Sequence, residues 1–178
     1  MYTYERLSCL PYGSNVAFLM SSVKNELSVP ANYYPNFSDW FNKVVLELTD
    51  GIRSIIIARR LNRISGIAIL KHSPVENKIC TFWVNPENRK HHVGSAMLLR
   101  CCSLFFNNPT ISMPGYLLWD FCGFRKYFSF VKKEDGIYRK NQSEFFFNVE
   151  LTRLLNSELL TSQNFSPALG NSNFAVNV

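Results

Sequence analysis

Three short segments rich in β-branched residues lie close together in the middle of the chain, and they constrain the fold more than any other feature. Their sequences are RSIIIARR (53–60), ISGIAILKH (64–72) and KICTFWVN (78–85). The connections LNR and SPVEN are short, whereas two parallel strands need a crossover of a dozen or more residues. The pattern therefore predicts three strands of an antiparallel meander.

Helical patterns come before this meander. A short strand over residues 3–10 is followed by one helix that begins at Ser14 and a second that runs from about Ser38 to Leu48, with Asn36 available as its cap. The second helix carries a single apolar stripe, formed by Phe37, Trp40, Phe41, Val44, Val45 and Leu48.

After the meander we expect a helix from Val93 to Phe105, a short strand ISM (111–113) and a helix from Pro114 through Phe128. Two closing strands, SFVKKEDGIYRK and SEFFFNV, are joined by NQ. The predicted order is β-α-α-β-β-β-α-β-α-β-β. This is an α/β (α+β) layout with an antiparallel centre.

Composition indicates one ordered domain. Of the 178 residues, 47% are hydrophobic and 18% charged, so we place a domain at residues 1–149 and expect a flexible, Asn- and Ser-rich tail at 150–178. No apolar run reaches the roughly 18–20 residues that span a bilayer, and no secretory signal is apparent. The five cysteines are odd in number and lack C-x-x-C spacing, so we expect a reduced, cytoplasmic protein without a metal site.

The segment VNPENRKHHVGSAMLLR (84–100) is the most unusual part of the sequence. It places four cationic or titratable side chains, Arg89 to His92, just before a predicted helix, although a helix N-terminus is already the positive end of the dipole. A bound diphosphate would explain this placement, because exposed N–H groups at a helix start bind anions. Gly94 would let the backbone approach the phosphate oxygens closely. The alternative is a solvated basic turn with no ligand.

The strand that ends in V-N-P-E, followed by R-x-x-x-V-G-S-A-M-L-L, resembles the GNAT superfamily of acyl-CoA-dependent N-acetyltransferases. The family's motif is an arginine or glutamine, two variable residues, glycine, one more residue, and glycine or alanine. Arg89 matches its first position and Gly94 its last, whereas His92 stands where the family usually has glycine. The resemblance covers roughly residues 40–148.

This resemblance implies a GNAT-like, mostly antiparallel sheet, flanked by helices and splayed between its fourth and fifth strands. It also implies acetyl-CoA as co-substrate, with its pantetheine arm lying in the gap between these strands. The residues expected to bind it are Phe82, Trp83 and Val84 of the strand, and Arg89, Lys90, His91, His92, Val93, Gly94, Ser95 and Ala96 of the loop and helix.

The catalytic groups are less well defined by the resemblance. Many GNAT enzymes have a tyrosine as general acid in the helix after the fifth strand, but the equivalent position here is Arg125. Tyr127 is our candidate to protonate the departing thiolate, with Tyr116 on another face of the same helix. The open candidates for accepting the amine proton are Glu144, Glu76 and Asp39.

Other residues that could carry chemistry have simpler structural interpretations. Cys80 is expected to be a buried structural thiol rather than a nucleophile. Trp40 and Phe41 are expected to pack in the core, although together with Tyr33 and Tyr34 they could shape an acceptor pocket.

Three functions remain open at this stage. The first is transfer of an acetyl group from acetyl-CoA to a primary amine of a small molecule or protein. The second is a non-catalytic, regulatory GNAT-like protein that binds CoA. The third is acetylation of an RNA-linked amine, favoured only weakly by the net charge of +6 and by a segment, residues 51–75, without carboxylates. No membrane partner is expected, and nothing in the sequence decides whether the protein forms a homodimer.

Overall fold

A seven-stranded sheet forms the centre of the protein, with strand order β1-β2-β3-β4-β5-β9-β6. The computed structural model describes residues 1–8, 14–28, 31, 36–74, 77–105, 109–114, 128–130, 132–133, 136–137 and 144–149. The strands of this sheet are β1 (Thr3–Leu7), β2 (Arg53–Arg60), β3 (Arg63–Lys71), β4 (Lys78–Val84), β5 (Thr110–Pro114), β6 (Phe128–Phe130) and β9 (Glu144–Val149). A separate two-stranded ladder joins β7 (Lys132–Lys133) and β8 (Gly136–Ile137).

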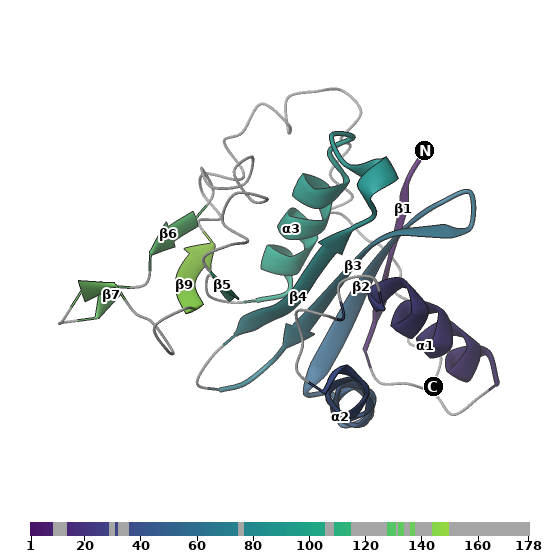
Figure 1. The fold of residues 1–178 in the computed structure, drawn as a ribbon, viewed down its shortest axis with the longest axis horizontal. Coiled ribbons are helices and arrows are strands. Elements are labelled where there is room, and N and C mark those ends of the chain that lie inside the picture. The colour runs from purple at the N-terminus through teal and green to yellow at the C-terminus, as the bar shows by residue number, and fades with distance from the viewer. Residues whose placement is uncertain are drawn as a thin grey trace.

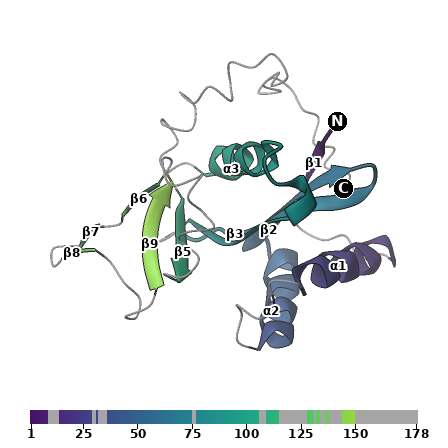
Figure 2. The same cartoon turned by 45° about the horizontal axis from the view of Figure 1, so that its top comes forward.

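Helices cover both faces of the sheet, which gives three layers (Figures 1 and 2). The helix α3 (Val93–Ser103) lies on one face, and α1 (Ser14–Leu27) and α2 (Phe37–Thr49) lie on the other. A short 3₁₀ helix, η2 (Pro86–Asn88), connects β4 to the loop before α3. Within the described residues, no helix combines the length and the apolar character needed to cross a membrane.

The alternation of side chains along β2 and β3 produces two separate cores. Ile56 and Ala58 of β2 face α3, whereas Ile55 and Ile57 face α1 and α2. Both faces of the central strands are covered by helices, so nearly every residue of β2 and β3 is buried. This explains why these segments are continuous apolar runs rather than alternating ones.

A β-bulge interrupts β4. Thr81 pairs with Ile69 and Ile79 pairs with Leu70, so Cys80 is an extra residue on the β4 side. The bulge changes the alternation along the strand: Ile79 and then Phe82 face the α3 core, whereas Trp83 packs in the core beneath α1 and α2.

The pairing between β4 and β5 is short and lies entirely on one side of this bulge. The two strands run parallel and pair only as Lys78 with Thr110 and Ile79 with Ile111. From Cys80 onward no β5 residue is paired with β4. The described residues of β5 therefore pair only with the N-terminal end of β4.

Most of the predicted elements are confirmed. The antiparallel meander β2-β3-β4, the first two helices and the helix at Val93 all form. Phe41, Val44 and Leu48 of α2 are buried, and the other members of its stripe pack partly buried against the same core. Asn36 is the N-cap residue of α2, as predicted, but it adopts a left-handed conformation and makes no side-chain capping bond.

The C-terminal third departs from the prediction in two ways. The predicted helix from Pro114 to Phe128 is wrong at both ends, because Pro114 pairs with Glu144 and Phe128 pairs with Val149. A proline has no N–H to donate, but it can end a strand. Residues 115–127 lie outside the described residues.

The first closing strand is not continuous. Phe128–Phe130 pairs with β9, while Lys132 pairs with Ile137 in a small hairpin. The Asp-Gly pair at 135–136 is a strong turn signal that the strand prediction ignored. The proposed domain boundary at residue 149 stays a prediction.

Candidate functional site

The segment between β4 and α3 is fixed to the sheet at several points. The Asn85 amide donates to the Ser65 carbonyl at 3.0 Å, and the Asn85 side chain accepts from the Glu87 amide at 3.0 Å. The Tyr2 hydroxyl of the edge strand donates to the Asn88 side chain at 3.1 Å. These bonds hold the start of the loop on the sheet, so the residues that follow project from a rigid base.

Two residues of the loop adopt left-handed backbone conformations. Lys90 has φ 63° and His92 has φ 60°. Glycine adopts this conformation at no steric cost, and histidine is one of the few other residue types enriched there. The position where the resembling family has glycine is therefore a position that favours glycine here, and His92 occupies it at the cost of some strain.

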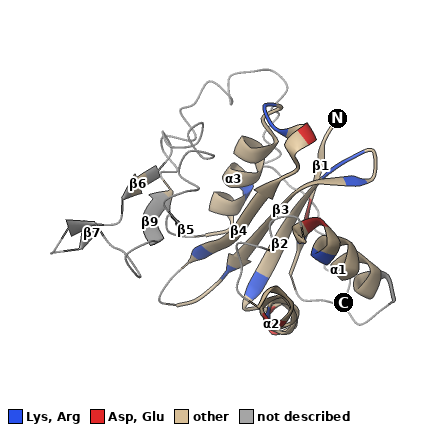
Figure 3. Ribbon diagram, in the orientation of Figure 1, with Lys and Arg blue, Asp and Glu red and all other residues tan. Residues whose placement is uncertain are grey.

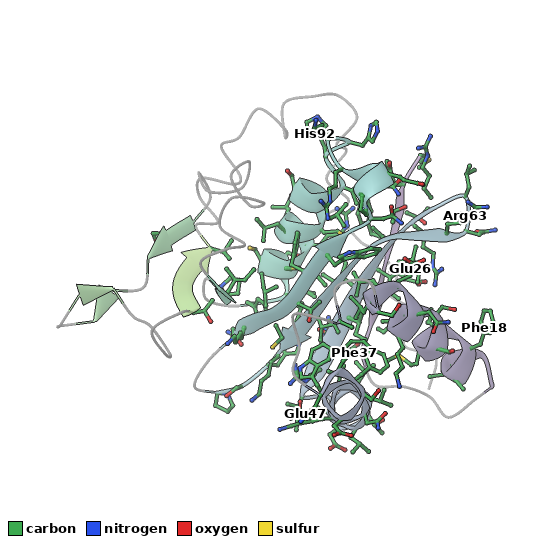
Figure 4. All side chains as sticks on the ribbon, in the orientation of Figure 1. Phe18, Glu26, Phe37, Glu47, Arg63 and His92 are labelled. Carbon is green, nitrogen blue, oxygen red and sulfur yellow. The ribbon has the colours of Figure 1, made fainter. Side chains whose placement is uncertain are left out.

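The side chains of this loop are exposed and mostly cationic. Arg89, Lys90, His91 and His92 are all exposed, and Figure 4 shows His92 projecting at the end of the molecule where α3 begins. Figure 3 shows the basic loop next to the single acidic residue of η2, Glu87. The first turn of α3 contains no acidic residue. Positive charge from the loop and from the helix dipole is therefore concentrated here.

The amide groups at the start of α3 are available to a ligand. The Ala96 amide donates to the His92 carbonyl at 3.0 Å, which is the first bond of the helix. Within the described part of the chain, no backbone carbonyl accepts from the amides of residues 90–95. The side chains of Arg89 to His92 are exposed, whereas Val93 and Gly94 are buried, so an anion would reach the helix start from the side of the loop.

The helix itself is anchored by close packing on β3. Val93, Gly94, Ala96 and Met97 are buried. A Cβ atom added to Gly66 of β3 would lie 2.5 Å from the Met97 sulfur and 3.1 Å from the Trp83 carbonyl oxygen. Any side chain at position 66 would therefore displace the end of the Met97 side chain and crowd the Trp83 carbonyl, so glycine favours the close approach of α3.

The loop also contacts the open edge of β4. Because the Asn85 amide is bonded to Ser65 of β3, the alternation of an antiparallel ladder turns the Trp83 backbone toward β3 and the Val84 backbone away from it. The Val84 carbonyl therefore faces the side where β5 has separated. The Arg89 side chain donates to this carbonyl through Nε at 3.2 Å.

The predicted cofactor-binding residues are thus brought together by the structure. The loop joins the end of β4 to the first turn of α3, and its four cationic residues are exposed, whereas Trp83, Val93, Gly94 and Ala96 are buried. Of the three strand residues, the register directs the backbone of Phe82 and Val84 toward the gap and that of Trp83 toward β3. The contribution of each to binding stays a prediction.

The predicted catalytic residues are not placed by the structure. Tyr127, Tyr116, Arg125, Glu76, Tyr33 and Tyr34 lie outside the described residues. Asp39 is exposed in the first turn of α2, and Glu144 begins β9 opposite Pro114.

The cysteines of the described residues are free thiols. Burial raises the pKa of Cys102 to about 12 and that of Cys101 well above its ordinary value, so neither supplies a thiolate at neutral pH. Cys80 is half-buried at the bulge, not fully buried as expected. Phe41 is a core residue as predicted, and Trp40 is half-buried beside it.

Sequence reasoning missed the residues that support the loop. Asn85 could have been found, because Asn followed by Pro and Glu is a helix-start pattern. The contact between Tyr2 and Asn88 joins residues 86 positions apart, and no local pattern signals it.

Comparison with known proteins identifies the fold. No protein-family model matches the chain, and no curated protein matches it in sequence. Among solved structures, a GNAT-family acetyltransferase from Bacillus cereus matches with a TM-score of 0.59 at 17% identity, covering 84% of this chain and 97% of the other.

Two further solved structures are similar over most of their length. The ribosomal-protein-S18-alanine N-acetyltransferase from Escherichia coli has a TM-score of 0.59 at 9% identity, covering 85% of this chain and 94% of the other. The PaiA N-acetyltransferase from Thermoplasma acidophilum, in complex with coenzyme A, has a TM-score of 0.56 at 12% identity, covering 84% and 99%. The chain therefore has the fold of the GNAT acetyltransferases. Its parallel β4-β5 pair within a mostly antiparallel sheet is part of that fold.

Proposed function

We propose that this protein is an N-acetyltransferase that moves an acetyl group from acetyl-CoA directly to a primary amine. The observation that carries the proposal is the start of α3, where no backbone carbonyl of the described residues accepts from the first amides, next to the Val84 end of β4, with which the described residues of β5 do not pair. The solved relative in complex with coenzyme A supports this choice of co-substrate.

The diphosphate of acetyl-CoA would bind at the loop. The amides of Val93, Gly94 and Ser95 point out of the helix start, where the dipole favours negative charge. Arg89 and Lys90 add mobile cations beside it. The ligand supplies the negative charge that the sequence of the first turn lacks.

The pantetheine arm would extend along β4 like an added strand. Its amide groups match the spacing of backbone groups on a strand edge, which is the logic of strand addition in peptide recognition. The described residues of β5 pair with β4 only before the bulge at Cys80, and the arm would lie beyond that point, along the Val84 end of β4.

Transfer requires a neutral amine placed against the thioester carbonyl. The amine nitrogen attacks the carbonyl carbon, the carbon–sulfur bond breaks, and the amine loses one proton while the CoA thiolate gains one. A β4 amide near Val84 would stabilise the oxygen of the tetrahedral intermediate, and we assign Tyr127 as donor of the proton to the thiolate. The protein mainly supplies positioning and deprotonation.

Acetyl-CoA binding is the first test. Gly94 is the second residue of α3, and a Trp side chain there would occupy the space of the phosphates. We expect acetyl-CoA to raise the Tm of the wild type and not that of Gly94→Trp. Ser38→Trp, at the exposed second residue of α2, is the control and should keep the full shift. Because Gly94 is buried, a lost shift counts only if the ligand-free Tm of Gly94→Trp stays near that of the wild type.

Turnover of acetyl-CoA with a panel of amines is the second test. Release of free CoA that depends on an amine supports the enzyme, and Tyr127→Phe should lower kcat with little change in KM. Binding without turnover for any amine would instead indicate the regulatory, non-catalytic protein. A Tm unmoved by saturating acetyl-CoA would contradict both.

A further inference from the structure

We propose that the Arg89 side chain occupies the pantetheine-binding edge of β4 when no ligand is bound, and that the diphosphate draws it away. Arg89 would thus make binding of the pantetheine arm depend on binding of the phosphates. The inference rests on the proposed function, because it concerns the same co-substrate.

The direction of the Val84 carbonyl is the first support. The bond between the Asn85 amide and Ser65 sets the phase of the β3-β4 ladder, so the Val84 carbonyl points away from β3 and toward the β5 side. An arm added along this edge needs an acceptor for its amide N–H groups. The Val84 carbonyl is the acceptor nearest the phosphate loop.

The bond to Arg89 is the second support. Arg89 Nε donates to the Val84 oxygen at 3.2 Å. A pantetheine N–H approaching the same edge would meet the arginine side chain already there. The two donors therefore compete for one carbonyl.

The position of Arg89 permits the exchange. The side chain is exposed, so it can rotate away without disturbing the core. Arg89 is also the first cation of the loop that leads to the open amides of α3. A guanidinium forms its strongest bonds with phosphate oxygens. A diphosphate at the helix start therefore gives Arg89 a better partner than a neutral carbonyl.

The experiment separates the two halves of the co-substrate. S-acetylpantetheine carries the thioester and the arm but lacks the adenosine diphosphate part. We expect Arg89→Ala to bind S-acetylpantetheine roughly threefold to tenfold more tightly than the wild type, the worth of one ordinary hydrogen bond. The same variant should bind acetyl-CoA about tenfold more weakly, because a charged phosphate contact is lost.

Lys90→Ala is the matched control. Lys90 is the neighbouring exposed cation, and within the described residues no contact of its side chain with β4 is present. This variant should weaken acetyl-CoA while leaving S-acetylpantetheine unchanged. Ligand-observed NMR titration measures the weak binding of S-acetylpantetheine, and calorimetry measures that of acetyl-CoA.

A second measurement uses both fragments together. In the wild type, saturating 3′-phosphoadenosine 5′-diphosphate, the part of CoA that carries the diphosphate, should tighten S-acetylpantetheine binding, and in Arg89→Ala this coupling should disappear. S-acetylpantetheine that binds Arg89→Ala no better than the wild type overturns the proposal, including the case in which neither binds measurably. Wild-type protein that fails to bind acetyl-CoA at all contradicts the proposed function itself, which distinguishes the two failures.

Discussion

The starts of α2 and α3 have nearly the same backbone but opposite charge. Each helix follows a left-handed residue, Asn36 with φ 53° and His92 with φ 60°, and neither residue makes a side-chain capping bond. In each, the fourth residue of the helix donates to the carbonyl of that left-handed residue at 3.0 Å. The difference lies in the third helical residue, which is Asp39 in α2 and Ser95 in α3.

This comparison shows that the unusual feature of α3 is its charge rather than its geometry. The Asp39 carboxylate complements the dipole of α2. The α3 start has no such carboxylate and is preceded by cations. A helix start that the chain leaves without negative charge is suited to an anion from outside. Exchanging corresponding residues between the two helices tests this conclusion.

The largest effect is expected from Gly66, the β3 residue on which α3 packs. Gly66→Val places methyl groups where the Met97 sulfur and the Trp83 carbonyl now lie, so we expect the free energy of unfolding to fall by about 1–3 kcal/mol. Urea denaturation measures the change, with Gly66→Ala as a milder variant. If α3 is displaced, the acetyl-CoA shift in Tm should shrink as well. An unfolding free energy equal to that of the wild type would show that the close approach of α3 is not needed.

The second-largest effect is expected when the third residues of α2 and α3 are exchanged. Ser95→Asp should raise the unfolding free energy of the ligand-free protein by about 0.3–1 kcal/mol, because a carboxylate complements the dipole. The same change should weaken acetyl-CoA binding about tenfold through repulsion of the diphosphate. Asp39→Ser is the reciprocal variant, expected to destabilise the protein and leave binding intact. Tighter acetyl-CoA binding by Ser95→Asp would contradict the assignment of the phosphate site.

A smaller effect is expected at the left-handed residue before each helix. His92→Gly removes the Cβ atom that disfavours φ 60°, so the unfolding free energy should rise by up to about 1 kcal/mol. Asn36→Gly should change it by only a few tenths, since asparagine tolerates this conformation well. Thermal unfolding of the two variants in parallel measures the stability change that each substitution causes. A loss of stability in His92→Gly would mean that the imidazole makes a contact that outweighs the strain.

The smallest effect is expected near the opposite end of α3. His72 lies within 2.6 Å of the Ser54 hydroxyl through Nε2 and contacts the Phe105 ring. Burial, with a smaller contribution from Arg6, lowers the pKa of His72 below 6.5. The folded state thus binds the proton less well than the unfolded state, so His72 contributes stability above pH 6.5 that is lost as the pH falls through its folded pKa.

Denaturation at pH 8 and pH 5 checks this expectation. The wild type should lose more stability over this interval than His72→Gln, which keeps a polar group near Ser54. Equal losses in the two proteins would show that His72 titrates alike in the folded and unfolded states. The effect is small because the side chain is only half-buried.

The sequence predicted the elements that depend on local patterns. The meander was predictable because its strands are β-branched and closely spaced, and the stripe of α2 was predictable from helical periodicity. The proposed position of the anion site rests on the basic residues before Val93. The C-terminal third was harder, because β6 and β9 form through long-range pairing that overrides the local pattern at Pro114 and Phe128.

The sequence by itself determined which residues are cationic, where a helix begins and which strands are buried, since these follow from side-chain chemistry and periodicity. Only the tertiary structure decided that a bulge at Cys80 follows the short β4-β5 pairing, that the Val84 carbonyl faces away from β3, and that Arg89 donates to this carbonyl. These features depend on the register between strands, and register is set by contacts between residues far apart in the chain.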